Sequence, residues 1–159
     1  MLRLDEAVAE GLRAEELDPL NGFAKSITAE ALMNAHWYDE ALQKLDEALE
    51  LDPDHGGAYI YVAAIRNLQG RPEEALEAAR RAARRTGADA GQILVLQAWS
   101  HALLGDGERA LQVMDQALEL RGPIATASGY AIVLQVLGRE DEALREHPRF
   151  RAIRQGMGL

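Results

Sequence analysis

The chain contains no cysteine, and this absence removes several kinds of chemistry at once. Disulfide bonds, thiolate metal sites and cysteine nucleophiles are excluded, because each of them requires a cysteine sulfur. The absence also fits a reducing compartment, where disulfides rarely form. Any function must therefore come from other side chains.

Long apolar runs and an excess of basic charge are also missing. No stretch approaches the roughly 20 apolar residues of a membrane-spanning helix, and the start of the chain turns acidic without the apolar core of a signal peptide. The formal net charge of -9 disfavours binding to a phosphate backbone. The 159 residues, 48% of them hydrophobic, suit one globular domain. We expect a cytoplasmic protein that binds neither membranes nor nucleic acids.

No arrangement of polar side chains indicates catalysis or a cofactor. The histidines are far apart in sequence and lack the spacing of metal ligands. Ser100 and His101 are adjacent, so on a helix they point in different directions and form no nucleophile–base pair. A Gly-x-x-x-x-Gly-Lys phosphate loop is lacking. We predict a protein that is not an enzyme and has no metal, cofactor or small-molecule substrate.

What the chain does contain is a repeat. An alanine that follows acidic residues and precedes a large aliphatic residue recurs five times, with spacings of 34, 34, 35 and 33 residues, at Ala7, Ala41, Ala75, Ala110 and Ala143. A second alanine follows the middle three after seven residues, which is two helical turns. Glycine stands five residues before the last three marker alanines. Such a period is typical of a helical repeat protein.

Each feature of the repeat has a physical reason. Two helices can cross closely only where their side chains are small, which explains the alanines. Glycine allows the turn between paired helices, and acidic residues suit the first turn of the helix that follows. The Asp-Pro pairs at Pro19 and Pro53 end a helix, because proline cannot continue one. The pattern predicts an all-α fold of paired helices without a strand.

These motifs resemble the tetratricopeptide repeat family, most closely over residues 22–55. The resemblance implies a right-handed α-solenoid of about nine to ten helices in a single domain over residues 1–159. It divides the chain into an N-terminal half repeat at 1–19, repeats at 22–55, 56–89, 91–123 and 124–147, and a capping helix at 148–159. Three residues depart from the family pattern, since His36 replaces a turn glycine, Arg85 replaces a leucine and Pro148 comes early in the second helix of the fourth repeat.

The two ends of the chain leave more than one interpretation open. Because the chain begins halfway through a repeat, either Met1 lies inside a longer protein or a lone helix caps the stack. The tail from Pro148 to Leu159 resembles the ending of repeat domains in bacterial multidomain regulators, which include nucleotide-cyclase-type and winged-helix transcriptional proteins. Phe150 and Ile153 in this tail would also suit a simple cap.

The resemblance further implies where a ligand binds. In this family, contacts come from the first helix of each pair, at the second, fifth, sixth, ninth and twelfth repeat positions. Those positions predict a peptide-binding groove formed by Phe23, Ser26, Glu30, Met33, Ile60, Tyr61, Ala64, Asn67, Val95, Trp99, Ser128, Ile132 and Gln135. Ile27 and Gln92 occupy two more of them. Family members that grip a C-terminal carboxylate use lysine, arginine and asparagine, but here Ser26 and Glu30 stand in two of those places, so that activity is not expected.

Two questions about these surfaces stay open in the sequence. Trp99 and Tyr61 either line the groove or fill the core between repeats. The arginines at 80, 81, 84 and 85 either dock an acidic partner or form a solvated outer face paired with glutamates.

The leading hypothesis is a protein–protein interaction module that binds an apolar or amphipathic peptide segment of a protein partner in its inner groove. The alternative is a regulatory or oligomerising C-terminal domain of a larger bacterial signalling or transcriptional regulator. Its ligand would be the parent protein's own domains or a second copy.

Overall fold

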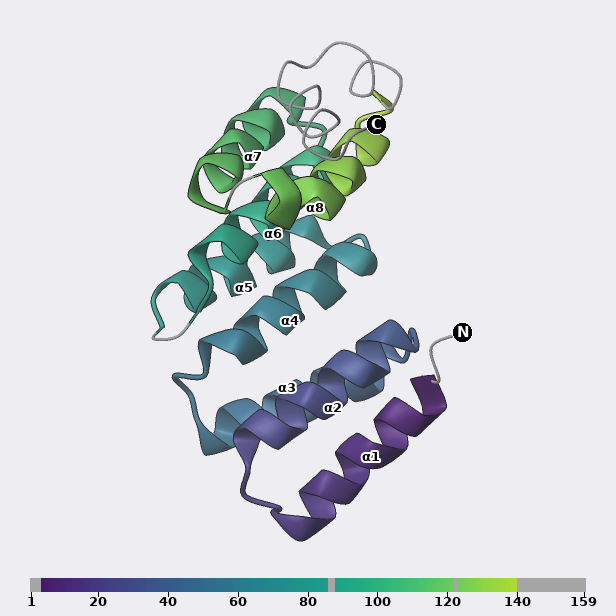
Figure 1. Cartoon of the computed structure of the whole chain (residues 1–159). Helices are drawn as coiled ribbons and strands as arrows, with labels where there is room; N and C mark the ends of the chain where they lie inside the picture. The colour runs from purple at the N-terminus through teal and green to yellow at the C-terminus, as the bar shows by residue number, and fades with distance from the viewer. Residues whose placement is uncertain (1–3, 86–87, 122, 140–159) are drawn as a thin grey trace.

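The computed structural model describes residues 4–85, 88–121 and 123–139. For residues 121 and 123–127 it describes the backbone alone. Within this part of the chain the regular structure is helical throughout and comprises eight helices (Figure 1). They are α1 (Leu4–Leu17), α2 (Gly22–Asn34), α3 (Tyr38–Leu51), α4 (Gly56–Leu68), α5 (Pro72–Ala83), α6 (Ala90–Leu103), α7 (Gly107–Arg121) and α8 (Pro123–Val136).

The helix boundaries follow from local chemistry. Before α2, the Asn21 side chain accepts a hydrogen bond of 3.0 Å from the Ala24 amide, and before α6 the Asp89 side chain accepts one of 2.9 Å from the Gln92 amide. Such caps satisfy amide groups that have no partner inside the helix. Pro72 begins α5, where its missing N–H costs nothing. Asp106 accepts from the Arg109 amide at the start of α7.

The turns inside the helix pairs share one backbone conformation. The residue that closes each turn has a positive φ, at 70° for Gly70 and 79° for Gly105, and Gly138 after α8 has the same conformation with a φ of 64°. His36 takes the same place between α2 and α3 with a φ of 64°. Glycine reaches this left-handed region without steric cost, whereas histidine does not. The histidine that the sequence places at a turn-glycine position therefore adopts the glycine conformation.

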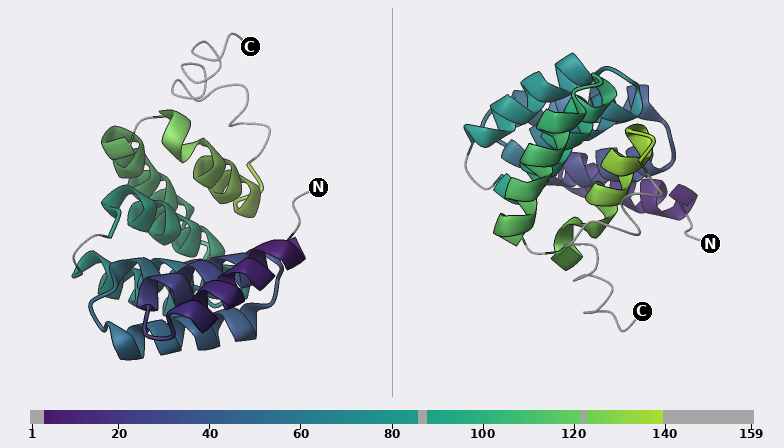
Figure 2. Two further views of the ribbon diagram at one scale, coloured as in Figure 1. Left: turned by 60° about the horizontal axis from the view of Figure 1, so that its bottom comes forward. Right: turned by 90° about the horizontal axis from the view of Figure 1, so that it is seen from above.

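The helices stack as antiparallel pairs, α2 with α3, α4 with α5 and α6 with α7 (Figures 1 and 2). The first helices of successive pairs pack on one another, α2 on α4, α4 on α6 and α6 on α8. Among the described helices, successive second helices make no such contact. The first helices of the pairs therefore lie closer together than the second helices, so the array is curved. Its inner side is formed by α2, α4, α6 and α8.

The core consists largely of the repeated alanines. Each of the marker alanines Ala41, Ala75 and Ala110 is fully buried, as is the second alanine of the same three helices. Between them lie aliphatic side chains such as Leu45 and Ile65. Ala7 on α1 is exposed instead, since the backbone of α1 packs against α2 alone among the described helices.

The first five helices lie within the expected divisions of the chain. The half repeat at 1–19 contains α1, the repeat at 22–55 contains α2 and α3, and the repeat at 56–89 contains α4 and α5. The predicted second helix of the repeat at 124–147 and the predicted cap at 148–159 lie outside the described residues.

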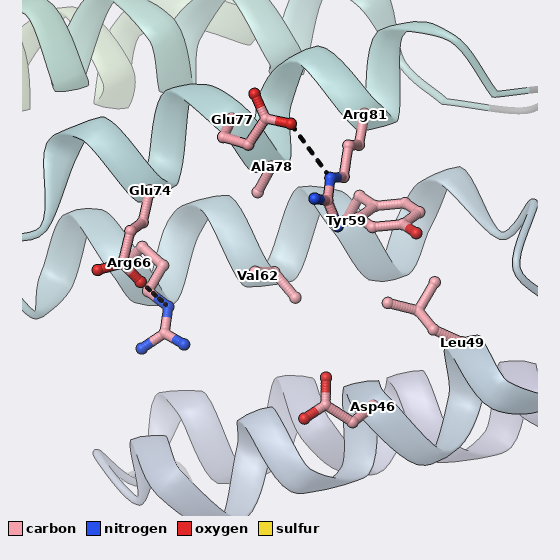
Figure 3. Close-up of a pocket in the computed structure, with 9 residues that line it drawn as sticks. All are labelled: Asp46, Leu49, Tyr59, Val62, Arg66, Glu74, Glu77, Ala78 and Arg81. Atoms are coloured by element: carbon pink, nitrogen blue, oxygen red, sulfur yellow. Dashed lines mark hydrogen bonds and ion pairs between the residues drawn. The ribbon is translucent and has the colours of Figure 1, made fainter.

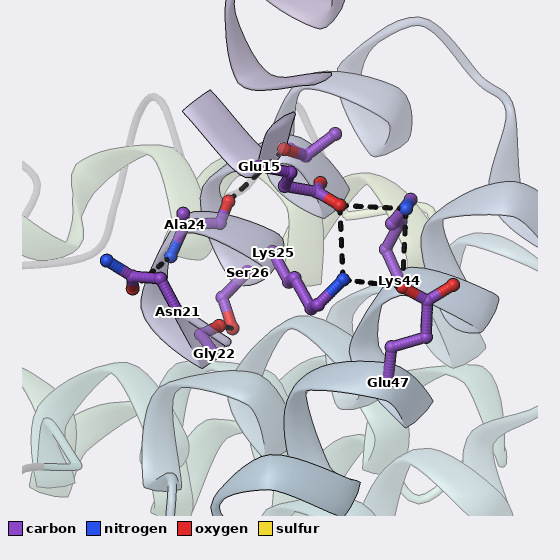
Figure 4. A network of polar contacts seen from close by, with 9 residues as sticks. Glu15, Asn21, Gly22, Ala24, Lys25, Ser26, Lys44 and Glu47 are labelled. Atoms are coloured by element: carbon purple, nitrogen blue, oxygen red, sulfur yellow. Dashed lines mark hydrogen bonds and ion pairs between the residues drawn. The ribbon is translucent and has the colours of Figure 1, made fainter. Parts of the chain in front are cut away.

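A closed ring of four charges joins α1 to the first pair (Figure 4). Glu15 of α1 contacts Lys25 of α2 at 3.3 Å and Lys44 of α3 at 2.8 Å. Glu47 of α3 contacts the same two lysines at 2.8 and 3.3 Å. Each lysine thus lies between two carboxylates and each carboxylate between two lysines.

The ring shifts the titration of its members. Burial alone would raise the pKa of Glu15, but hydrogen bonds from Lys44, Thr28 and Lys25 outweigh it and hold this pKa below its ordinary value. The hydrogen bond from Lys25 lowers the pKa of Glu47. The pKa values of both lysines are raised, chiefly by the hydrogen bond to Glu47 for Lys25 and to Glu15 for Lys44.

Candidate peptide-binding surface

The inner surface begins on α2, where Phe23, Ile27 and Glu30 lie on one face because they are spaced by four and three residues. Phe23 and Ile27 are exposed. The Phe23 and His55 rings pack edge to face, with their centres 6.3 Å apart. Two apolar side chains and an acid thus share one open helix face. Its composition suits an amphipathic ligand.

Glu30 is held by the neighbouring repeat. The Tyr61 hydroxyl of α4 donates a hydrogen bond of 2.6 Å to the Glu30 carboxylate, and both residues are half-buried. Burial raises the pKa of Tyr61, and the bond to the Glu30 carboxylate raises it further, so the hydroxyl stays protonated and keeps donating. This bond fixes one carboxylate oxygen and orients the acid on the inner surface.

Three of the predicted groove residues are instead buried, which corrects their expected exposure to a ligand. Ile60 belongs to the core formed with α5 and α6. Ser26 donates to the Gly22 carbonyl at 3.2 Å, and its oxygen lies 2.9 Å from His55 Nε2. Ile60 and Ser26 share the fifth repeat position, and in these two repeats that position turns toward the neighbouring helix.

Asn67, the third of these residues, joins two repeats. Its side-chain amide donates to the Leu96 carbonyl at 3.0 Å, and its carbonyl accepts from the Ser100 hydroxyl at 2.8 Å. Both bonds cross from α4 to α6 and are buried. A buried amide with both ends satisfied specifies the register of the two helices. Its role is therefore structural.

Trp99 combines the two interpretations that the sequence leaves open. It is half-buried and packs against two cores, one formed by α4, α5 and α6 and the other by α6, α7 and α8. Ala64 packs against the first of these cores beside it. Tyr61 is similarly half-buried against the core of the first pair. Part of each ring reaches solvent, and the rest contributes to inter-repeat packing.

The other predicted residues differ in exposure along the array. Met33, Val95 and Ile132 are half-buried, whereas Ser128 and Gln135 of α8 are exposed. Val95 meets α8 closely, since a Cβ added to Gly129 would lie 2.3 Å from its Cγ1 atom. The inner surface is thus apolar and acidic on α2 and polar without charge on α8.

A hollow lies between α3, α4 and α5 (Figure 3). It has a volume of about 280 Å³ and is lined by Asp46, Leu49, Tyr59, Val62, Arg66, Glu74, Glu77, Ala78 and Arg81. Four of its five charged residues form two ion pairs, Arg66 with Glu74 at 3.3 Å and Arg81 with Glu77 at 3.3 Å.

Arg80 and Arg81 are therefore best interpreted as part of a paired outer face. Arg80 also contacts Glu77, at 3.5 Å. Arg85 does not extend outward with the others, because it is half-buried, pairs with Asp54 and lies over the Tyr59 ring at 5.8 Å. That position corrects the expected set of four outward arginines.

Two parts of the chain, residues 28–90 and 68–130, match the family described as Tetratricopeptide repeat. The chain belongs to the tetratricopeptide repeat (TPR) family. As a member of it, the chain is a protein–protein interaction module with an all-α solenoid fold. No curated protein sequence matches it significantly.

Solved structures of TPR proteins share this fold. TTC0263, a thermophilic TPR protein in Thermus thermophilus, is 22% identical with a TM-score of 0.75, over 98% of this chain and 89% of that one. The crystal structure of MamA is 15% identical with a TM-score of 0.71, over 98% and 91%. YrrB, a TPR protein with an unusual peptide-binding site, is 20% identical with a TM-score of 0.62, over 84% and 75%.

Among the described residues, no helix is both long enough and apolar enough to cross a bilayer. In the same part of the chain, His, Asp and Glu side chains do not gather in threes as they would around a metal ion.

Proposed function

We propose that this TPR domain binds an apolar or amphipathic segment of a partner protein along the inner side of α2, α4, α6 and α8. The observation that carries the proposal is the face of α2, where exposed Phe23 and Ile27 adjoin the Glu30 carboxylate oriented by Tyr61. Exposed apolar side chains beside a fixed acid suit a segment that combines apolar anchors with a lysine or arginine.

The choice of residue to test depends on how much each side chain also contributes to the core. Phe23 is the most exposed of the predicted aromatic residues, so its loss removes contact area without opening a core. Trp99 contributes to two cores, and its truncation would mix loss of binding with loss of stability. Phe23 is therefore the better residue to test.

The test uses peptides selected from a random displayed library on the immobilised full chain, with affinities then measured by calorimetry. We expect selected peptides to carry apolar residues and at least one lysine or arginine. Phe23→Ala should weaken them about tenfold or more, as truncation of an interface anchor does. Glu30→Gln should weaken the basic peptides and spare neutral ones.

Leu104→Ala is the matched control, because Leu104 is as exposed as Ile27 but lies in the turn between α6 and α7. Peptides that lose affinity on replacing Arg80, Arg81 and Arg84 while tolerating Phe23→Ala would place binding on the outer face. That result would contradict the proposal.

A further inference from the structure

Among the described residues, exposed apolar side chains are most concentrated where α1 turns into α2. Leu17 is 82% exposed, Leu20 78%, Phe23 65% and Ile27 43%. We call these four residues the N-terminal corner. Large hydrophobic side chains crowded onto so short a segment are typical of an interaction site.

Hydrogen bonds and ion pairs hold the backbone of the N-terminal corner in place. The Asn21 amide donates to the Asp18 carbonyl at 3.2 Å and the Asn21 side chain caps α2, so the turn that presents Leu20 is fixed at both ends. The charge ring holds the last turn of α1 through Glu15. The exposed leucines are therefore offered by an ordered surface.

The charges around the corner are acidic. Glu16 and Asp18 stand beside Leu17 and are exposed, and Glu30 lies one turn beyond Ile27. Helix α1 carries five acids and a single arginine between Leu4 and Leu17. A segment that covers this corner should therefore combine apolar residues with cations and carry no acid.

One segment of this chain outside the described residues has that composition. Residues 148–159 contain the apolar residues Phe150, Ile153, Met157 and Leu159, three arginines at 149, 151 and 154, and no acid. The chain as a whole has the opposite charge balance, with 26 acidic and 17 basic residues.

The segment that binds should come from a second copy. Among the described helices, the backbone of α1 packs against α2 alone, whereas α8, after which the chain continues toward residue 148, packs against α6 and α7. The corner and the exit from α8 therefore lie at opposite ends of the stack (Figure 2). A tail of one copy on the corner of the next gives a head-to-tail contact, which can repeat along a chain of copies.

We propose that residues 148–159 of one copy dock on the N-terminal corner of another, with the tail arginines facing the acids of α1 and its apolar residues covering Leu17, Leu20 and Phe23. The proposal depends on the proposed function only in that Phe23 belongs to both surfaces. It makes self-association a property of this domain, with a second copy of the chain as the partner.

The test exploits the absence of cysteine in the natural chain. Two single-cysteine variants of the full chain, Leu20→Cys and Ile153→Cys, are mixed in equal amounts and oxidised slowly. A disulfide forms only where the two Cα atoms come within about 4.4–6.8 Å, so cross-linking reports docking. We expect the mixed dimer to form about tenfold faster than it does with Leu104→Cys in place of Leu20→Cys.

A charge reversal provides the second arm. Replacing Arg149, Arg151 and Arg154 by glutamate should abolish the mixed cross-link and the concentration-dependent sedimentation of the cysteine-free chain. Reversing Glu16 and Asp18 to lysine in the other copy should restore the cross-link and the sedimentation behaviour. The tail glutamates would then face lysines, so the two surfaces attract each other again.

Three results would overturn the proposal. The first is a chain that sediments as a monomer at every concentration without a mixed cross-link. The second is cross-linking equal to that of the Leu104→Cys control. The third is a cross-link that forms within a single chain carrying both cysteines, which would make the tail a cap of its own molecule. None of them depends on library peptides binding to the groove, so the two proposals fail separately.

Discussion

A single backbone conformation recurs at the turn of every described helix pair, and one residue type does not suit it. Gly70, Gly105 and Gly138 have positive φ, as does His36. The left-handed region costs a non-glycine residue about 1 kcal/mol. His36 partly offsets that cost through its Nδ1 atom, which lies 2.7 Å from the Tyr38 hydroxyl.

We therefore expect His36→Gly to stabilise the protein by about 0.5–1 kcal/mol, with the midpoint of urea unfolding as the measurement. Gly70→His is the converse change, since a Cβ at Gly70 would meet nothing within 4 Å and the cost comes from the backbone alone. It should destabilise by a similar amount. A less stable His36→Gly would mean that the contact with Tyr38 outweighs the backbone strain.

The burial of single residues was only partly predictable from the sequence. The alanine spacing identifies the crossing positions, because close helix contact demands small side chains wherever it occurs. The fifth repeat position carries Ser26, Ile60 and Val95, and its exposure depends on the size of whatever lies opposite. Ala88 likewise lies between α5 and α6, outside any helix, yet a Cβ on Gly56 would come within 2.8 Å of it. Such contacts join segments that are far apart in the sequence, and a repeat pattern does not show which of these segments meet in the fold.

At the scale of helices, close crossings set the stability of each pair. Ala75 of α5 is fully buried against α4, whereas Ala83 at the end of the same helix is exposed. We expect Ala75→Leu to destabilise by about 1–3 kcal/mol through overpacking, and Ala83→Leu to change stability little. Thermal or urea unfolding of the two variants checks this. Equal costs would show that this crossing has room to adjust.

The attachment of α1 depends on the charge ring and should depend on pH. The lowered pKa values of Glu15 and Glu47 contribute stability that is fully present above their ordinary pKa near 4.5 and is lost as the pH falls through the lowered values. The raised pKa values of Lys25 and Lys44 contribute stability below 10.5, and it is lost as the pH rises through the raised values. The ring therefore stabilises fully between these limits.

We expect Glu15→Gln to destabilise the protein at pH 7 by about 1–2 kcal/mol, less than for a fully buried pair because the other members reach solvent. The difference from the natural chain should shrink in acid, since Glu15 is then neutral as well. Faster hydrogen exchange in α1 should accompany it. Glu16→Gln, on the exposed side of the same helix, is the control. A difference that persists unchanged in acid would contradict the assigned role of the charge.

At the scale of the whole molecule, the stack is held by contacts between neighbouring repeats, so its cooperativity depends on the weakest junction. The junction between α4 and α6 contains the buried Asn67 amide with its bonds to Leu96 and Ser100. Each half of the array also has its own tryptophan. Trp37 is exposed beside α3, and Trp99 packs against the cores on both sides of α6.

Asn67→Ala should weaken this junction, because it removes both side-chain bonds that cross from α4 to α6 and leaves the Ser100 hydroxyl to bond only within its own helix, to the Leu96 carbonyl at 2.9 Å. Loss of such buried bonds costs about 1–3 kcal/mol. We expect urea unfolding followed by Trp37 and by Trp99, each in a single-tryptophan background, to share one midpoint in the natural chain. In Asn67→Ala the two midpoints should separate, since the halves then unfold with less coupling. Asn34→Ala is the control, because Asn34 is exposed on α2. Midpoints that fall together in Asn67→Ala would mean that packing alone couples the repeats, and that the buried amide specifies their register without carrying their cooperativity.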